Sequence, residues 1–191
     1  MTQVVQGWTG RFLEDFRVGD IYQSRLGRTV TDADNIWFTL LTNNTNQAHY
    51  NAVYAEQAGL KGCIVNSALS LAIVAGLSVT DVSENGINLG WKNIELPAPI
   101  FPGDTLYSQS EVLAVRDSAS RPHMGIVTVR TEGVNQDGIC VVRYVRSILT
   151  WKRAHAPRTR LFPDASVPKP DALSFTAHRT GDETESVSNA Q

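Results

Sequence analysis

The stretch that most limits how this chain can fold is 66-NSALSLAIVAGLSV-79, which contains no charged side chain. It predicts a helix that Asn66 or Ser67 could cap, since both side chains accept hydrogen bonds from free N–H groups. Such a helix is apolar on most sides, so we expect it to be buried by the rest of the chain. The segment is too short to span a bilayer and is interrupted by Ser and Gly.

Strand-like segments follow this predicted helix and supply its cover. Their residue ranges are 86–101, 104–118, 123–135 and 139–153. Asp137-Gly138, between two β-rich runs, is typical of a hairpin turn. Long consecutive strands joined by short turns favour an antiparallel meander. We therefore expect an α+β fold, a single domain in which an antiparallel sheet wraps around one buried central helix.

The part of the chain before the apolar segment predicts shorter elements. A turn at residues 18–20 leads into a strand that runs to about Val30. Thr31 and Asp34 have the spacing of a capping box, which indicates an amphipathic helix over residues 31–42. A second short helix is expected over residues 51–60.

The predicted domain covers residues 1–153, because the strand periodicity stops after Arg153. Residues 154–191 are rich in Pro, Ser, Thr and charge, so we expect a largely irregular or disordered C-terminal extension. A chain of 191 residues is long enough for one domain of ordinary size.

Charge and composition exclude several classes of partner. The net charge is −2 and the pI about 6.1, a balance that lacks the basic footprint of a nucleic-acid or anionic-membrane binder. Cys63 and Cys140 lie far apart in apolar surroundings, which favours reduced thiols packed as small hydrophobes over a disulfide. The N-terminus does not resemble a signal peptide, so a cytoplasmic protein is the expectation.

The polar loop 42-TNNTNQAHYN-51 places one histidine, His49, after a crowd of Asn and Thr. Asn and Thr favour turns and caps, which accounts for a loop. Histidine suits proton transfer, because its ordinary pKa lies near neutral pH. From the residues alone, His49 is either a hydrogen-bonded structural residue or a catalytic acid/base.

The string 44-NTNQAH-49 resembles the motif of the MaoC-like dehydratase and (R)-specific enoyl-CoA hydratase family, which reads Asp, any residue, Asn, Pro, any residue, His. His49 matches the catalytic histidine and Asn46 the asparagine. Asn44 stands where the family has its catalytic aspartate, and Gln47 replaces the proline. The match therefore keeps one of the two catalytic side chains.

Two further stretches extend the resemblance, which covers roughly residues 10–153. The family opens its central helix with His-Gly, and Asn66 and Ser67 occupy those positions here. The stretch 95-ELPAPIFPGDTL-106 looks like the turn that enters a strand in the family. Residues 28–49 and 119–138 look closest to the branch of mesaconyl-CoA hydratases and β-methylmalyl-CoA dehydratases.

The resemblance implies a hot dog fold and a hydro-lyase that adds or removes water across the 2,3-bond of an acyl-CoA thioester. Short branched dicarboxylic acyl groups, of the mesaconyl or itaconyl type, are the substrates it suggests. The reaction needs no redox cofactor, and the sequence has no His/Cys/Asp cluster at ligand spacing, so we expect no cofactor and no metal. The resemblance also implies a homodimer or higher homo-oligomer. Lys61, Lys92, Arg143 and Lys152 are the candidate contacts for the CoA phosphates.

Each predicted site residue has a role in that chemistry. His49 is the expected general acid/base and Asn44, whose amide cannot act as a base, is expected to hold the water. The backbone N–H of Ser67, at a helix N-terminus, is the expected donor to the thioester oxygen. Asn66 and Asn46 are expected to line the substrate site or to fix its loops.

Other interpretations stay open. Asp32, Asp34 or Glu56 could replace the missing carboxylate, although capping and solvation explain all three. A non-catalytic acyl-CoA-binding protein or a subunit that supports an active partner could also carry Asn44, Asn66 and Ser67. A hot dog thioesterase is less well supported, because many of those enzymes use a carboxylate on the central helix and residues 66–79 contain none.

Overall fold

The computed structural model describes residue 5 and residues 7–157. The α-helices are α1 (Asp32–Leu41), α2 (Ala52–Gln57), α3 (Ser67–Leu77) and α4 (Val79–Val82), and the 3₁₀ helices are η1 (Leu13–Asp15), η2 (Gln47–His49) and η3 (Arg153–His155). The strands are β1 (Ile21–Gln23), β2 (Arg28–Thr29), β3 (Gly86–Glu95), β4 (Thr105–Asp117), β5 (Met124–Val134) and β6 (Cys140–Trp151).

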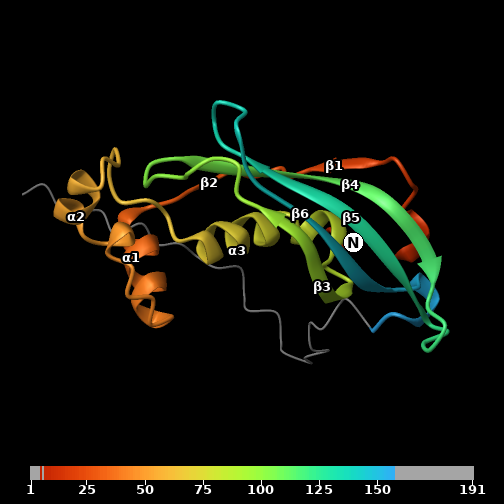
Figure 1. Cartoon of the computed structure of the whole chain (residues 1–191). Helices are drawn as coiled ribbons and strands as arrows, with labels where there is room; N and C mark the ends of the chain where they lie inside the picture. The colour runs from red at the N-terminus through yellow and green to blue at the C-terminus, as the bar shows by residue number, and fades with distance from the viewer. Residues whose placement is uncertain (1–4, 6, 158–191) are drawn as a thin grey trace, which may run out of the picture. The chain divides into compact units, whose positions relative to one another are not determined.

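The strands form an antiparallel sheet in the order β1-β4-β5-β6-β3, and β2 also pairs with β4. The three long strands β4, β5 and β6 are consecutive neighbours, as the short polar turns between them predicted. Gly138 adopts a φ of +75° in the β5–β6 hairpin, which a residue with a side chain rarely adopts. The meander prediction is confirmed (Figure 1).

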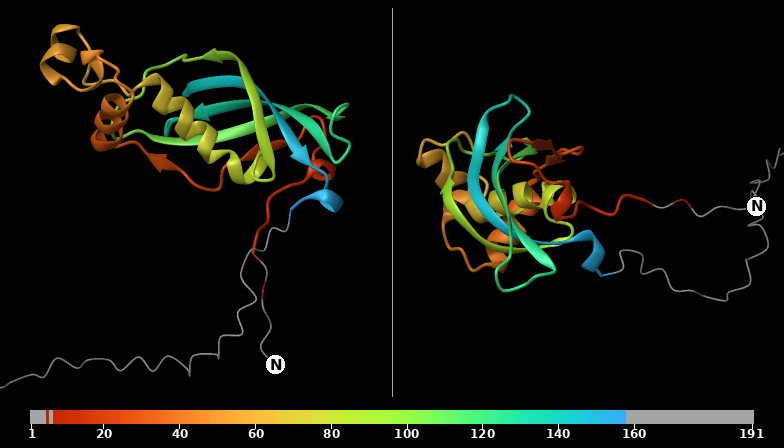
Figure 2. Two further views of the ribbon diagram at one scale, coloured as in Figure 1. Left: turned by 90° about the horizontal axis from the view of Figure 1, so that it is seen from below. Right: turned by 90° about the vertical axis from the view of Figure 1, so that its right-hand side faces the viewer.

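Helix α3 lies along the concave face of the sheet (Figure 2), which is the expected α+β arrangement. Val74 of α3 and Leu106, Val142 and Tyr144 of the sheet are buried in one apolar cluster. Alternate residues of β5 and β6 point inward, and this alternation gives the sheet its buried face. Packing against the sheet therefore fixes α3 more than its own helix propensity does.

The sheet covers only one side of α3. Ala68, Ala72 and Gly76, spaced four residues apart, form an exposed stripe of small residues. Our expectation that the rest of the chain would bury this helix is wrong for this stripe within the described residues, because a single curved sheet encloses one side of a cylinder. The stripe is apolar, so its hydropathy predicted burial that residues 5 and 7–157 do not supply.

Helix α1 begins as the sequence predicted. The side chain of Thr31 accepts from the N–H of Asp34 at 3.2 Å, and the carboxylate of Asp34 accepts from the N–H of Thr31 at 2.8 Å. The hydrogen bonds from Thr31 hold the pKa of Asp34 below its usual value, and the guanidinium of Arg28, 2.7 Å away, acts in the same direction. Capping and ion pairing therefore account for Asp34.

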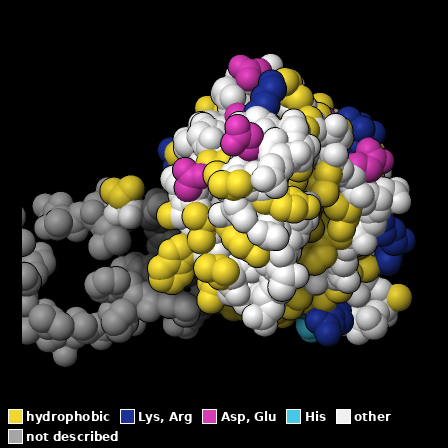
Figure 3. Space-filling view, turned by 60° about the vertical axis from the view of Figure 1, so that its left-hand side comes forward, with side chains coloured by type: hydrophobic (Ala, Val, Ile, Leu, Met, Phe, Trp, Pro, Cys, Tyr) yellow, Lys and Arg dark blue, Asp and Glu magenta, His cyan; other side chains and the backbone are white. Residues whose placement is uncertain are grey.

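The faces of α1 are inverted relative to the amphipathic helix that we expected. Asn35 and Thr39 are buried, whereas Trp37, Leu40 and Leu41 are 69%, 61% and 76% exposed. Helices α1 and α2 project beyond one end of the sheet (Figure 1), so their apolar side faces away from the core. Figure 3 shows the molecule turned so that this end comes forward. Hydrophobic and uncharged side chains fill the middle of that face, and charged side chains lie around its margin.

Two predicted strands are shorter than expected. The strand predicted to reach Val30 divides into β1 and β2, since the chain bends between them where Gly27 lies against the ring of Tyr107. Strand β3 ends at Glu95 instead of continuing to Phe101. The prolines of residues 96–101 cannot donate to a ladder, and Ile100 instead accepts a hydrogen bond from Val65 at 2.8 Å.

Past Arg153, the last residue of the predicted domain, the chain continues in η3. The backbone N–H and guanidinium of Arg153 donate to Glu14 and Asp15 near the N-terminus. The predicted C-terminal extension lies outside the described residues from residue 158 onward. In the described part of the chain, none of the helices combines the length and apolarity needed to cross a membrane.

Gly133 of β5 gives a test of the helix–sheet contact. A Cβ at this position would lie 2.4 Å from a methyl carbon of Val74, so Gly133→Ala must push α3 off the sheet. We expect the free energy of unfolding to fall by about 1–3 kcal/mol, measured by urea denaturation. The control is Gly62→Ala, where the added Cβ meets nothing within 4 Å. Equal stability of the two variants would contradict this packing.

Candidate active site

The loop between α1 and α2 is built by asparagine caps. Asn43 ends α1 with a φ of +53°, which Asn tolerates better than most residues. The side-chain oxygen of Asn44 accepts from the N–H of Asn46 at 2.9 Å, and that of Asn46 accepts from Ala48 at 3.1 Å. Asn51 then caps α2. The polar run therefore fixes a compact path that ends at His49, in η2.

The ring of His49 is buried and has a defined orientation. Its Nδ1 lies 2.9 Å from the carbonyl oxygen of Ile64, and the whole residue is 6% exposed. A carbonyl oxygen only accepts, so Nδ1 carries a hydrogen, and in the neutral ring Nε2 keeps its lone pair. Among the described residues, Nε2 makes no hydrogen bond. The imidazole is thus fixed by one nitrogen, and the other is available to take a proton.

Asn35 ties the histidine to the central helix. Its side-chain nitrogen donates to the carbonyl oxygens of His49, at 2.7 Å, and of Ile64, at 3.1 Å. Its oxygen accepts from the N–H of Asn66 at 2.9 Å. The amide is 1% exposed, so these bonds act without competition from water. One side chain on α1 therefore sets the spacing between the histidine and the start of α3.

The N-terminus of α3 forms the other half of the site. Asn66 caps it, accepting from Ala68 at 3.0 Å, and donates to the hydroxyl of Thr39 at 3.3 Å. The N–H of Ser67 has no acceptor among the described residues, and Ser67 is exposed. A free N–H at a helix N-terminus attracts developing negative charge. Asn66 thus serves as a cap, and Ser67 presents the donor.

Three of the five predicted site residues are connected through Asn35 or by direct sequence, and the other two act on the site only through the loop. His49 and Asn66 share the partner Asn35, and Ser67 follows Asn66 directly. Asn44 and Asn46 act on His49 through the loop, since their side-chain oxygens are occupied by backbone N–H groups. Asn44 is half-buried, and its side-chain nitrogen makes no hydrogen bond within the described chain.

The possible replacement carboxylates do not reach this site. Asp34 is used in the capping box and in its ion pair with Arg28. Asp32 and Glu56 are exposed, and across residues 5 and 7–157 neither forms a hydrogen bond or ion pair with His49. Capping and solvation, which the sequence favoured for these residues, remain the explanation.

The candidate phosphate contacts divide into two groups. Arg143 pairs with Glu132 at 2.8 Å and Lys152 with Asp117 at 2.8 Å. Lys61 and Lys92 are exposed and form no ion pair within the described part of the chain. Lys61 precedes Ile64 by three residues, so it lies on the segment that carries the acceptor for His49.

The remaining candidates lie outside this site. Cys63 and Cys140 are free and half-buried, and burial raises the pKa of the Cys140 thiol. His123 packs against His155 with ring centroids 4.1 Å apart. Within residues 5 and 7–157, three or more His, Cys, Asp or Glu side chains nowhere gather in a way that could hold a metal ion.

Known proteins are similar to this chain in sequence and in fold. The family model for mesaconyl-CoA hydratase matches residues 5–159. A mesaconyl-CoA hydratase from Cereibacter sphaeroides is 32% identical over 195 residues, covering 91% of this chain and 56% of that protein. A β-methylmalyl-CoA dehydratase from Chloroflexus aurantiacus is 36% identical over 171 residues, covering 87% of this chain and 47% of that protein.

A solved structure of a MaoC domain protein dehydratase from Chloroflexus aurantiacus superposes with a TM-score of 0.74 at 34% identity, covering 84% of this chain and 46% of the other. Sheet, central helix and loop therefore define a MaoC-like protein with the hot dog fold. Within that class, the chain belongs to the mesaconyl-CoA hydratase family. It spans about half the length of the curated relatives that it matches.

Asn35 is a residue that sequence patterns did not single out. The available signal was a pair of polar residues, Asn35 and Thr39, four apart in a helix whose other side is apolar. Apolar side chains normally mark the buried side, so the pair appeared to face solvent. The structure reverses that assignment because these two side chains satisfy backbone and cap groups of the site.

Replacing Asn35 by Leu tests the role of these hydrogen bonds. The substitution leaves the carbonyl of His49 and the N–H of Asn66 without their partner in a buried place, at about 1–3 kcal/mol each. We expect Asn35→Leu to lower the free energy of unfolding by at least about 2 kcal/mol in chemical denaturation. The control Asn51→Ala, which removes a partly exposed cap, should cost about 1 kcal/mol. A smaller loss for Asn35→Leu than for the control would contradict the assignment.

Proposed function

We propose that this chain takes part in adding water to, or removing it from, the 2,3-bond of an acyl-CoA thioester, with His49 as the acid/base. The observation that carries the proposal is the pair formed by the open Nε2 of His49 and the unpaired N–H of Ser67, connected through Asn35. The names of the relatives, mesaconyl-CoA hydratase and β-methylmalyl-CoA dehydratase, support the substrate class. Short branched dicarboxylic acyl groups are accordingly the first candidates.

In the hydration direction, the oxygen of a water forms a bond to C3 while Nε2 of His49 accepts one of its protons. The electron pair of the double bond moves toward the thioester oxygen, which the N–H of Ser67 stabilises. The imidazolium then delivers the proton to C2, so that H and OH are both added and His49 is regenerated. The bond from Nδ1 to Ile64 holds the ring in place through both transfers.

Asn44 takes a supporting role in this proposal. Its oxygen is occupied by Asn46, so its side-chain nitrogen is the group left to donate a hydrogen bond to the water. An amide does not remove a proton, and the reaction then depends on one acid/base group instead of two. A protein of this kind would turn over slowly alone, or would act with a second protein that supplies a carboxylate.

Substituting His49 gives the direct test of activity. We expect His49→Ala to lower kcat by about 100-fold or more on whichever of crotonyl-, mesaconyl- and itaconyl-CoA is turned over, because the proton acceptor is lost. The enoyl-thioester absorbance measures this. His123→Ala, which alters a histidine packed against His155, should retain full activity.

The outcomes distinguish a hydratase from a non-catalytic acyl-CoA-binding protein and from a thioesterase. Equal activity in the wild type and His49→Ala would remove His49 from the mechanism. Binding of a thioester without turnover of any substrate in the panel would favour a non-catalytic acyl-CoA-binding protein or partner subunit. The thioesterase alternative predicts release of free CoA, which a thiol reagent detects in the same samples.

We also propose that the chain pairs with a second copy along β3, as an exposed apolar edge suggests. Strand β3 pairs only with β6 among the described strands, and Ile87, Leu89, Trp91 and Ile94 on it are about half exposed. An apolar edge strand of this kind tends to pair with another chain. The exposed apolar side of α1 supports assembly too.

The cytoplasmic location stays a prediction.

Light scattering at micromolar concentration tests this pairing. We expect a dimer or higher homo-oligomer for the wild type and dissociation for Leu89→Arg, which places a charge on the edge that would be covered. Val18→Arg, an exposed apolar residue far from β3 in the chain, is the control and should leave the mass unchanged. A wild-type monomer would contradict the proposal.

A further inference from the structure

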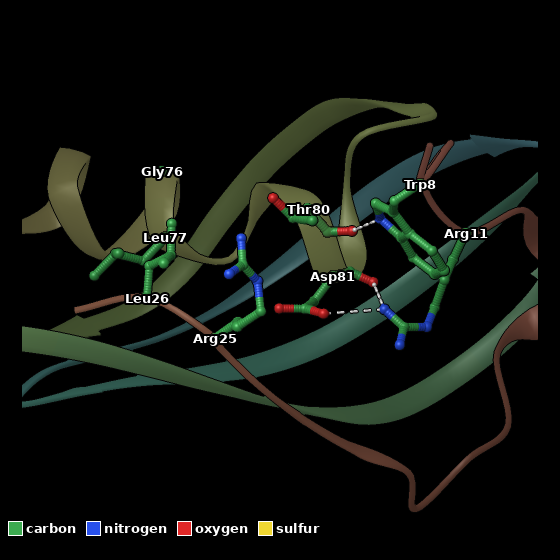
Figure 4. Close-up of a pocket in the computed structure, with 8 residues that line it drawn as sticks. All are labelled: Trp8, Arg11, Arg25, Leu26, Gly76, Leu77, Thr80 and Asp81. Carbon is green, nitrogen blue, oxygen red and sulfur yellow. Dashed lines mark hydrogen bonds and ion pairs between the residues drawn. The ribbon is translucent and has the colours of Figure 1, made fainter. Parts of the chain in front are cut away.

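A cavity of about 580 Å³ opens at the C-terminal end of α3, away from His49. Its walls come from the end of α3, from α4, from the segment after β1 and from residues 8 and 11 (Figure 4). Helix α3 is 11 residues long, or about 16 Å, and the candidate active site lies at its other end. The cavity is therefore separate from the site formed by His49 and Ser67.

One side of the cavity is held rigid by interactions within the chain. The guanidinium of Arg11 bonds to the carboxylate of Asp81 at 3.1 Å and to its carbonyl oxygen at 3.0 Å. It also lies over the rings of Trp8, at 5.1 Å, and Tyr22, at 4.1 Å. The indole N–H of Trp8 donates to the carbonyl of Thr80 at 3.2 Å. The aromatic wall is thus in place before any ligand arrives.

Arg25 gives the cavity an unneutralised positive charge. Figure 4 shows its guanidinium between Leu26 and Leu77 on one side and Thr80 and Asp81 on the other, with no dashed line reaching it. Across the described part of the chain Arg25 forms no hydrogen bond or ion pair. The cavity contains two guanidinium groups and one carboxylate, which is already paired with Arg11, so its formal charge is +1.

Gly76 keeps the cavity open. It lies near the end of α3, its φ is not in the left-handed region, and a Cβ built on it would meet nothing within 4 Å. Neither the helix nor its packing therefore requires glycine, which is disfavoured in helices relative to alanine. Because Gly76 has no side chain, an apolar space lined by Leu26 and Leu77 remains beside Arg25.

We propose that this cavity is a second binding site, which takes a small monoanion with a flat apolar body, of the class of aromatic carboxylates. The carboxylate would bind the guanidinium of Arg25 through two parallel hydrogen bonds. The apolar body would lie against Leu26 and Leu77, in the open space at Gly76. A single net positive charge suits a monocarboxylate better than a nucleotide phosphate, which carries several negative charges.

Isothermal titration of the full chain with 2-naphthoate tests the proposal. We expect saturable binding with a Kd of about 1 mM or lower. Arg25→Gln should weaken it by at least about 10-fold because the charge-assisted bonds are lost. Gly76→Leu should abolish it by filling the cavity. Arg17→Gln, at another exposed arginine, and His49→Ala at the candidate active site should bind as the wild type does.

Several results would overturn the proposal. These are the absence of saturable binding to the wild type, equal binding by the neutral 2-naphthylmethanol, and retention of affinity in both Arg25→Gln and Gly76→Leu. Loss of binding in His49→Ala would place the ligand in the catalytic site. Tighter binding of adenosine 3′,5′-bisphosphate than of 2-naphthoate would identify the cavity as a site for the nucleotide end of CoA. Hydration assays are independent of these binding measurements. The proposed second site and the proposed hydratase activity can therefore fail separately.

Discussion

The candidate site depends on one buried amide. The side chain of Asn35 donates to two carbonyl oxygens and accepts from one N–H, all within 3.1 Å. These bonds join α1, the loop that ends at His49, and the first residues of α3, segments that are far apart in the sequence. Because the amide is almost fully buried, each bond satisfies a group that would otherwise be left without a partner. The sheet fixes α3, and Asn35 then fixes His49 relative to α3.

Much of the fold follows from local patterns in the sequence. The capping box of Thr31 and Asp34, the Asn66 cap and the Asp137-Gly138 turn all act over a few residues, so the sequence displays them directly. The inverted faces of α1 could not be predicted this way. Whether Asn35 and Thr39 or Trp37 and Leu41 face inward depends on unpaired groups of a distant segment, which no periodicity records. The stripe of small residues on α3 was misjudged for a related reason, since hydropathy does not say how far one sheet reaches around a helix.

The geometry of the candidate site is compatible with some of the expected roles and not with others. Nε2 of His49 and the N–H of Ser67 have no hydrogen-bond partner among the described residues, as their proposed roles require. The side-chain oxygen of Asn66, however, caps α3, and that of Asn44 accepts a hydrogen bond within the loop. Both findings follow from the tendency of asparagine to bond to nearby backbone, which the composition of the loop already indicated. The exposed apolar surfaces of α1 and β3 are the observations on which the proposed pairing with a second copy rests.

The proposed chemistry requires that His49 donate through Nδ1 and keep Nε2 free to accept a proton. Long-range ¹H–¹⁵N correlation spectra of protein labelled in its 4 histidines distinguish the two neutral tautomers, and the spectrum of His49→Ala assigns the signal. We expect neutral His49 to carry its hydrogen on Nδ1, held by the carbonyl of Ile64. A hydrogen on Nε2 would contradict the proposed role of His49, because that nitrogen could then no longer accept the proton of an attacking water.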